Sequence, residues 1–209
     1  MSPKRIDRTE RRRVILRAAT EVFAARGYRA ATMEEIAAAA GVAKGTLYLY
    51  FPSKEALFFA LFERFADDAM AEGGADSETT NAVDAVAALL LQIAARIDAD
   101  TVLVPLTLEF WSVAGVAETR DRFGARYGQM LDMFRGQITA MLRAGQRRGE
   151  VKEKLPLQPL ASTLLGVIDG LIVQRWVDTE LSVADTLREA LPALMAGMRS
   201  GPGDARPAA

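Results

Sequence analysis

Apolar residues recur at helical spacing along nearly the whole chain, and no stretch alternates strictly as a half-buried strand does. Glycine, proline and short polar runs interrupt this pattern at intervals, and Gly27 is suited to end the first helix. The sequence therefore predicts an all-α fold of about nine helices. Their expected ranges are about 9–26, 33–40, 44–51, 54–70, 79–97, 101–115, 118–148, 157–178 and 182–199.

The composition lowers the expectation of catalysis. The chain of 209 residues contains neither cysteine nor histidine, which excludes disulfides, thiolate zinc sites and the commonest general base. An enzyme built on this chain would have only Glu109, Asp169 or a lysine as its general base. No catalytic residue, metal site or cofactor is therefore predicted.

The charge is distributed unevenly. Residues 1–54 carry 11 basic and 5 acidic side chains, whereas the remaining residues carry 15 and 22, although the net charge is only −1. A basic first quarter on an acidic remainder is typical of a DNA-binding unit attached to a body that does not touch DNA.

The most informative segment is 32–54, TMEEIAAAAGVAKGTLYLYFPSK. Thr32 and Glu35 form the capping box that begins a short helix, and Gly41 can supply the positive φ of a tight turn. A second short helix follows and ends before Pro52, and Ser53 is expected to cap the next one. This pattern predicts a helix-turn-helix.

The second short helix leaves one face free for DNA. That face carries Lys44, Thr46, Tyr48 and Tyr50, and Gly45 exposes backbone N–H groups near the helix N-terminus. Donors, a slim N-terminal end and a cation are what a recognition helix in the major groove requires. Packing roles for the two tyrosines and a merely solvated Lys44 are the alternatives.

The segment AAAAGVAKGTLYLYFPSKEALF, with Gly27-Tyr28 and Thr32 before it, closely resembles the helix-turn-helix of the TetR family of repressors. The resemblance implies a three-helix DNA-binding head on a helical-bundle body for ligand binding and dimerisation. The expected division is a head at 1–54, a body at 55–200 and a disordered tail at 201–209.

The resemblance also assigns DNA-binding roles by position. Thr32 would contact phosphate, the start of the recognition helix would enter the groove, and Lys54 would clamp the DNA backbone. Leu49 departs from the family pattern, so it either touches a thymine methyl or loses a contact. The expected DNA-binding residues are Thr32, Ala43, Lys44, Gly45, Thr46, Tyr48, Leu49, Tyr50 and Lys54.

A homodimer is expected because one short helix reads too few bases for genomic specificity. The last two long helices carry broad apolar faces, which in the resembled family form the dimer interface. An internal core of a single protomer is the alternative for both helices. The expected interface residues are Leu164, Ile168, Leu171, Ile172, Leu187, Leu191 and Leu194.

Large and adaptable side chains in the body could line an apolar cavity, with two acidic residues as polar anchors, although plain core packing is the alternative. The candidate pocket residues are Phe62, Phe65, Glu109, Phe110, Trp111, Met130, Met133, Phe134 and Asp169.

The function predicted from these features is transcriptional repression. A palindromic double-stranded operator would be released when an unidentified, mostly apolar small molecule binds the body. The alternative is a DNA-binding regulator without a ligand, controlled by a partner protein. The longest apolar stretch, 160–173, is too short to span a bilayer, so a cytoplasmic protein without membrane contact is expected.

Overall fold

The computed structural model describes residues 8–72, 81–100, 102–114 and 117–201. Within these ranges the chain forms nine α-helices and no named strand, which confirms the expected all-α fold. The expected tail at 201–209 lies outside the described residues except for Gly201. The helices are α1 (Arg8–Ala30), α2 (Met33–Ala39), α3 (Lys44–Tyr50), α4 (Lys54–Glu72), α5 (Ala82–Ala99), α6 (Leu103–Ala114), α7 (Ala117–Arg148), α8 (Leu157–Val177) and α9 (Val183–Met195).

The helix α1 is broken near its end. Gly27 has φ 75° and ψ 162°, a left-handed conformation that favours glycine, and one helical turn follows it. The predicted end of the first helix at Gly27 is therefore confirmed, and the extra turn changes the direction of the chain before α2.

The caps of the helix-turn-helix form as the sequence predicts. The Thr32 hydroxyl accepts from the Glu35 backbone N–H at 3.2 Å, and the Glu35 carboxylate accepts from the Thr32 N–H at 3.0 Å. Gly41 has φ 63° in the turn between α2 and α3. Ser53 accepts from the Ala56 N–H at 3.1 Å and so caps α4. The two caps fix where α2 and α4 begin, whereas α3 follows the Gly41 turn without a side-chain cap.

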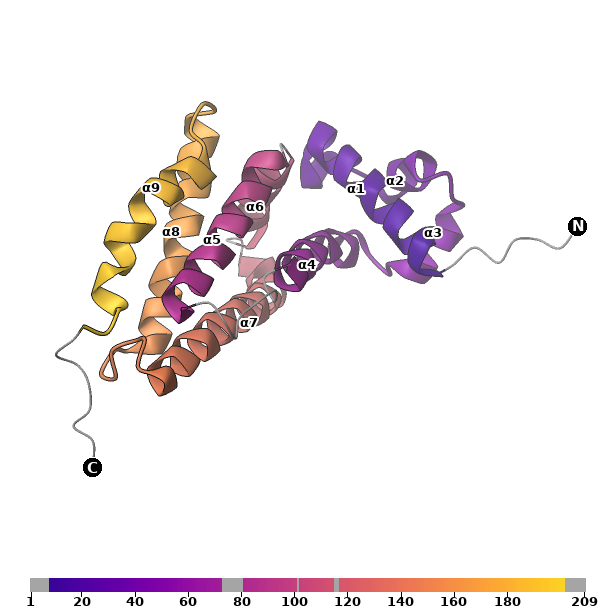
Figure 1. Ribbon diagram of the computed structural model, residues 1–209. Helices are drawn as coiled ribbons and strands as arrows, with labels where there is room; N and C mark the ends of the chain where they lie inside the picture. Colours follow the sequence, from indigo (N-terminus) through magenta and orange to yellow (C-terminus); the bar gives the residue numbers. More distant parts are fainter. Residues whose placement is uncertain (1–7, 73–80, 101, 115–116, 202–209) are drawn as a thin grey trace, which may run out of the picture.

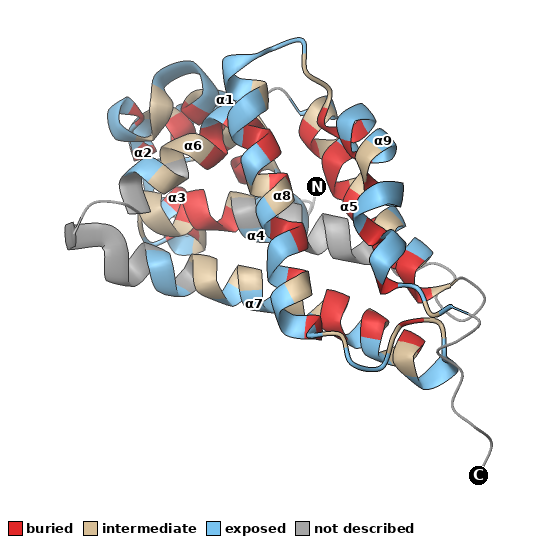
Figure 2. Ribbon diagram, turned by 90° about the vertical axis from the view of Figure 1, so that its left-hand side faces the viewer, coloured by how far each residue is buried: buried red, intermediate tan, exposed pale blue. Residues whose placement is uncertain are grey.

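Two groups of buried side chains hold the molecule together, and in Figure 2 they follow the inward faces of the helices. The head core joins α1, α2, α3 and the first turns of α4, and it also includes Leu106 of α6. The body core joins α5, α6, α7, α8 and α9. Trp111 and Met130 pack against both cores, so α6 and α7 connect the two groups.

Figure 1 shows α5, α8 and α9 side by side at the far end from the N-terminus, with α7 crossing beneath them. The helix α5 packs on α9 and α7, and α6 packs on α1, α7 and α8. At the α5–α7 contact, a Cβ on Gly145 would lie 2.5 Å from the Ala82 Cβ and 2.7 Å from Val151 Cγ2. Glycine at 145 therefore allows the two helices to approach closely. The three other glycines in α7, at 124, 128 and 136, do not interrupt the helix.

The 21 residues of α8 make it the one described helix that is long and apolar enough to cross a membrane by length and composition. The expectation concerned the shorter stretch 160–173 within this helix, and it is not contradicted. Seven residues of α8 are nevertheless buried against the rest of the chain, as in a core helix.

Candidate DNA-reading head and effector cavity

The outer face of α3 is open to solvent. Leu49 is 80% exposed and Tyr48 is 41% exposed, whereas Leu47 on the opposite face is fully buried. A Cβ on Gly45 would meet no atom within 4 Å, so the N-terminal end of α3 is slim as well as exposed. A short helix anchored by one buried leucine thus presents its other side outward.

The cation and hydroxyl groups near this face already have partners within the chain. The Lys44 ammonium forms an ion pair with Glu34 of α2, and this hydrogen bond raises the pKa of Lys44. The Thr32 hydroxyl is part of the capping box. Both groups are exposed, so DNA phosphate would compete with solvated partners.

Three further residues expected at the DNA surround this face. Ala43 is the exposed N-cap residue of α3, and Thr46 is half-buried. Tyr50 is half-buried and packs against the head core. The DNA contacts of these residues stay predictions.

Lys54 is bound to the end of α1. Its ammonium donates to the backbone carbonyls of Tyr28 at 2.7 Å, Arg29 at 3.1 Å and Ala31 at 2.8 Å. The same ammonium lies 4.7 Å from the centre of the Tyr28 ring. Burial lowers the pKa of Lys54, and the charge of Glu109 opposes that shift. The structure thus gives Lys54 a contact within the chain, and the expected clamp on DNA phosphate stays a prediction.

Glu109 reaches the same turn from the body. Its carboxylate accepts a hydrogen bond from the Tyr28 backbone N–H and another from the Arg29 N–H at 3.3 Å. A Cβ on Gly27 would lie 3.1 Å from Glu109 Oε1, so glycine there satisfies both the positive φ and the close approach. Glu109 is not part of the described cavity lining, because these contacts direct it toward α1, and its contact with a ligand stays a prediction.

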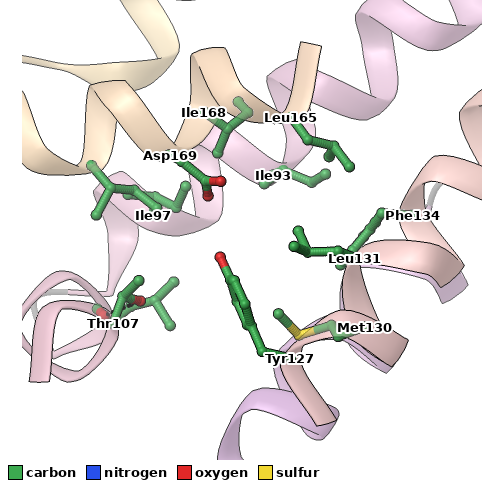
Figure 3. Close-up of a pocket in the computed structure, with 12 residues that line it drawn as sticks. Ile93, Ile97, Thr107, Tyr127, Met130, Leu131, Phe134, Leu165, Ile168 and Asp169 are labelled. Atoms are coloured by element: carbon green, nitrogen blue, oxygen red, sulfur yellow. Dashed lines mark hydrogen bonds between the residues drawn. The ribbon is translucent and has the colours of Figure 1, made fainter. Parts of the chain in front are cut away.

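The body contains a cavity of about 70 Å³ between α5, α6, α7 and α8. Figure 3 shows its lining, which is apolar apart from one threonine, one tyrosine and one aspartate. The described lining residues are Ile93, Ile97, Leu103, Thr107, Tyr127, Met130, Leu131, Phe134, Leu165, Ile168, Asp169 and Ile172.

Three expected pocket residues, Met130, Phe134 and Asp169, line this cavity. Trp111 packs between the two cores, and Met133 is 38% exposed, so neither is part of the described lining. Helical spacing alone did not show which face of each helix points toward the cavity. The side chains of Phe62, Phe65 and Phe110 lie outside those that the structure describes.

Tyr127 is a cavity residue that the sequence reasoning missed. In Figure 3 its phenol oxygen points across the cavity toward Asp169. Burial raises the pKa of Tyr127 to about 12, and the charge of Asp169 adds to that shift, whereas hydrogen bonding with Trp111 opposes it. Burial also raises the pKa of Asp169, against the effect of Tyr127. The signal was present, because Tyr127 stands three residues before Met130 and seven before Phe134, on one helical face.

Most residues expected at the dimer interface are buried within one protomer. Leu164, Ile168, Leu171, Ile172, Leu187 and Leu191 are each at most 6% exposed and belong to the body core. Their apolar faces pack on α5, α7 and each other's helices, which agrees with the internal-core alternative, and their place at a dimer interface stays a prediction. Leu194, at 51% exposed, is the exception.

Other apolar residues on the same two helices are exposed. On α8 these are Val173, Trp176 and Val177, which are 42%, 59% and 75% exposed. Trp176 also lines a surface groove of about 240 Å³ with Val104, Pro105 and Arg175 among its neighbours. Val173, Trp176 and Val177 form an apolar patch near the turn from α8 to α9, which we call the α8–α9 patch; Leu194 is near the other end of α9.

The chain matches two family descriptions over most of its length. Residues 15–61 match "Bacterial regulatory proteins, tetR family". Residues 82–204 match "BetI-type transcriptional repressor, C-terminal".

Individual relatives agree with these matches. The HTH-type transcriptional regulator TtgR of Pseudomonas putida is 29% identical, with 83% of this chain and 91% of that protein aligned. The HTH-type transcriptional activator FasR of Mycolicibacterium smegmatis is 52% identical over 64 residues, which cover 31% of this chain and 29% of that protein. The structure of the regulator FadR from Bacillus subtilis in complex with stearoyl-CoA is 27% identical, with a TM-score of 0.74, and covers 89% of this chain and 98% of that one. The protein belongs to the TetR family of bacterial transcriptional regulators.

Proposed function

We propose that the protein is a homodimeric repressor that binds a palindromic operator and releases it when a small, mostly apolar molecule enters the body cavity. The observation that carries this proposal is the position of α6. Its residue Thr107 lines the cavity, and Glu109 two residues later holds the end of α1. The cavity and the DNA-reading head thus share one helix.

DNA binding rests on the free face of α3. We propose that Lys44, Gly45, Thr46, Tyr48 and Leu49 enter the major groove. The exposed Leu49 is well placed for a thymine methyl, and the open N-terminal end of α3 suits a phosphate. Thr32 and Lys54 would contact the backbone on either side of the groove. The DNA itself lies in the cytoplasm, where we expect the protein to act.

Dimerisation rests on the α8–α9 patch. Exposed tryptophan and valine side chains at the end of one helix are typical of an interface rather than of a solvated surface. Two copies related by a two-fold axis would bury the patch against itself and place their recognition helices at two half-sites.

Release of the operator follows from differential affinity. A ligand that fits the cavity only when α6 shifts would favour the protein state with that shift. Because Glu109 is bonded to the backbone of Tyr28 and Arg29, a shift of α6 would move the end of α1 and thereby the head. The two recognition helices of a dimer would then no longer match the half-site spacing.

The size of the cavity supports a second candidate, a regulator controlled by a partner protein. About 70 Å³ is far below the ~300–1,000 Å³ of typical ligand pockets. A regulator whose cavity never opens would respond instead to a partner protein that binds its surface.

The decisive experiment is selection of duplexes from a random DNA pool by purified protein, before and after extraction of bound small molecules. The first candidate predicts a palindromic consensus with half-sites about 10 base pairs or slightly more apart. It also predicts that apolar compounds weaken binding to the selected duplex. A consensus that no small molecule affects would favour the partner-controlled regulator. Selection without any consensus after extraction would contradict both.

A further inference from the structure

The cavity is apolar except for a small set of polar groups on three helices. Thr107 of α6 donates its hydroxyl to the Leu103 carbonyl at 2.8 Å, so this donor is committed to its own helix. Tyr127 of α7 and Asp169 of α8 are the other two polar residues of the described lining. They face each other across the space in Figure 3. Any polar group of a bound ligand would therefore meet Asp169 and Tyr127.

Asp169 has no basic partner among the described side chains. No lysine or arginine belongs to the described lining of the cavity. The nearest arginine along α8, Arg175, lies 3.4 Å from Asp98 and donates to the carbonyls of Thr179 and Leu181. It is therefore committed to the end of its own helix rather than to the cavity.

Among the described side chains, the Asp169 carboxylate lacks the nearby cation and most of the hydrogen-bond donors that would stabilise its charge in the cavity. An ionised carboxylate offers about four acceptor positions, and a phenol can fill only one of them. Burial without a cation disfavours the charged form, in agreement with the raised pKa of Asp169. A ligand that brings a positive charge would remove this penalty, whereas an anionic ligand would increase it.

We propose that the cavity binds an apolar ammonium compound, and that Asp169, with Tyr127 beside it, selects this class against anionic acyl compounds. This proposal rests on the proposed function, because it assigns the chemistry of the effector. It also differs from what the likeness to a stearoyl-CoA complex would suggest. This chain shares its fold with that regulator, but Asp169 in this cavity favours a cationic ligand rather than an anionic one.

The size of the cavity sets the expected orientation. About 70 Å³ accommodates an ammonium group and a few carbon atoms, so a longer apolar part needs side chains such as Met130 and Leu131 to move. The ammonium would bond to Asp169, and the apolar part would lie along the isoleucines of α5. Short unbranched compounds are therefore the appropriate probes.

The test uses three probes of equal length, hexylamine, hexanol and hexanoate, on the full-length protein. Binding is measured by calorimetry without DNA, so the result does not depend on operator release. We expect hexylamine to bind about tenfold or more tightly than hexanoate, because only hexylamine brings a positive charge to the Asp169 carboxylate. Hexanoate binding equal to or tighter than hexylamine binding would overturn the proposal, as would no binding by any probe.

The variants assign the preference to the carboxylate. Asp169→Asn keeps the shape and removes the charge, so the preference for hexylamine over hexanoate should fall to about equal. Asp132→Asn, on the exposed surface of α7, is the matched control and should retain the preference. Circular dichroism of each variant confirms that it is folded. Retention of the preference in Asp169→Asn would overturn the assignment.

A separate measurement distinguishes this proposal from the proposed function. Hexylamine is added to the protein bound to its selected duplex, and the bound fraction is followed by fluorescence anisotropy. Binding of hexylamine without release would support the ligand class and contradict the effector role. Release by hexanoate but not by hexylamine would support an effector-controlled repressor and overturn the ligand class.

Discussion

The Glu109 carboxylate of α6 accepts a hydrogen bond from the backbone N–H of Tyr28, which lies 81 residues earlier in the chain. The helix is broken at Gly27, and an acceptor from another helix reaches the amides that follow the break. Lys54 holds the carbonyls of the same turn from α4. The short turn between α1 and α2 is thus bonded to both the head and the body.

Removal of the Glu109 contact should loosen this turn. We expect Glu109→Ala to lower the free energy of unfolding by about 1–2 kcal/mol, because two backbone donors lose an acceptor. Urea unfolding measures the loss, and Glu153→Ala, at an exposed position, serves as the control. If the proposed coupling is correct, Glu109→Ala also weakens the effect of an inducer on operator binding. An unchanged response to the inducer would show that coupling takes another route.

Loss of the lysine charge should affect the stability of the protein differently at Lys54 and at Lys44. Lys54→Met should destabilise the protein by about 1–3 kcal/mol, because three carbonyls lose their donor. Lys44→Met should leave stability within about 0.5 kcal/mol, since its ion pair is exposed. Lys44→Met should also reduce the dependence of operator binding on salt, as expected for loss of one phosphate contact. A reduced salt dependence in Lys54→Met would add a phosphate contact to its structural role.

Substitutions at Leu49 and Leu47 should distinguish a side chain that contacts DNA from one that stabilises the fold. Leu49→Ala should change stability by less than about 0.5 kcal/mol, because the side chain is 80% exposed. The same substitution should lower operator affinity and alter the preference at one base pair. Leu47→Ala removes a fully buried side chain and should cost ~2–5 kcal/mol of stability. Unfolding and duplex binding of both variants test the distinction, and full operator affinity in Leu49→Ala would remove it from the interface.

The α8–α9 patch should decide the oligomeric state. We expect Trp176→Arg to convert a dimer to a monomer, because it places a charge within the proposed apolar contact. Met133→Arg, at another exposed apolar position, should leave the dimer intact. Sedimentation equilibrium measures both. A dimer that survives Trp176→Arg unchanged would place the interface elsewhere.

The raised pKa of Asp169 predicts how stability depends on pH. A carboxyl group whose folded pKa exceeds its ordinary value of 3.8 binds its proton more strongly in the folded state. Its favourable contribution is complete below the unfolded pKa and is lost as the pH rises through the folded pKa. Asp169→Asn should therefore stabilise the protein at pH 7 more than at pH values near 4. A gain that is equal at both pH values would show that Asp169 is not buried as a charged group.

The sequence was sufficient for features that depend on local spacing. The Thr32–Glu35 capping box, the positive φ of Gly41 and the end of the first helix at Gly27 all depend on neighbours within a few residues. The helix boundaries agree for the same reason, to within four residues.

The sequence could not supply partners that are distant along the chain. Glu109 is conspicuous as an acid in an apolar helix, but its partners are backbone amides of a turn in another unit. The apolar faces of α8 and α9 likewise do not reveal whether they pack on their own protomer or on a second one. Leu164 and Leu187 are buried within the chain, whereas the less regular set at 173, 176 and 177 is exposed.

The small cavity has a consequence for the concentration at which the protein would respond. If the effector enters through a state in which the cavity has widened, its apparent dissociation constant equals the intrinsic one divided by the fraction of molecules in that state. A ligand larger than about 70 Å³ would bind only this widened state. The smaller the fraction of widened molecules, the higher the effector concentration needed for a half-maximal response. Substitutions that enlarge the cavity would lower that concentration without adding any contact to the ligand.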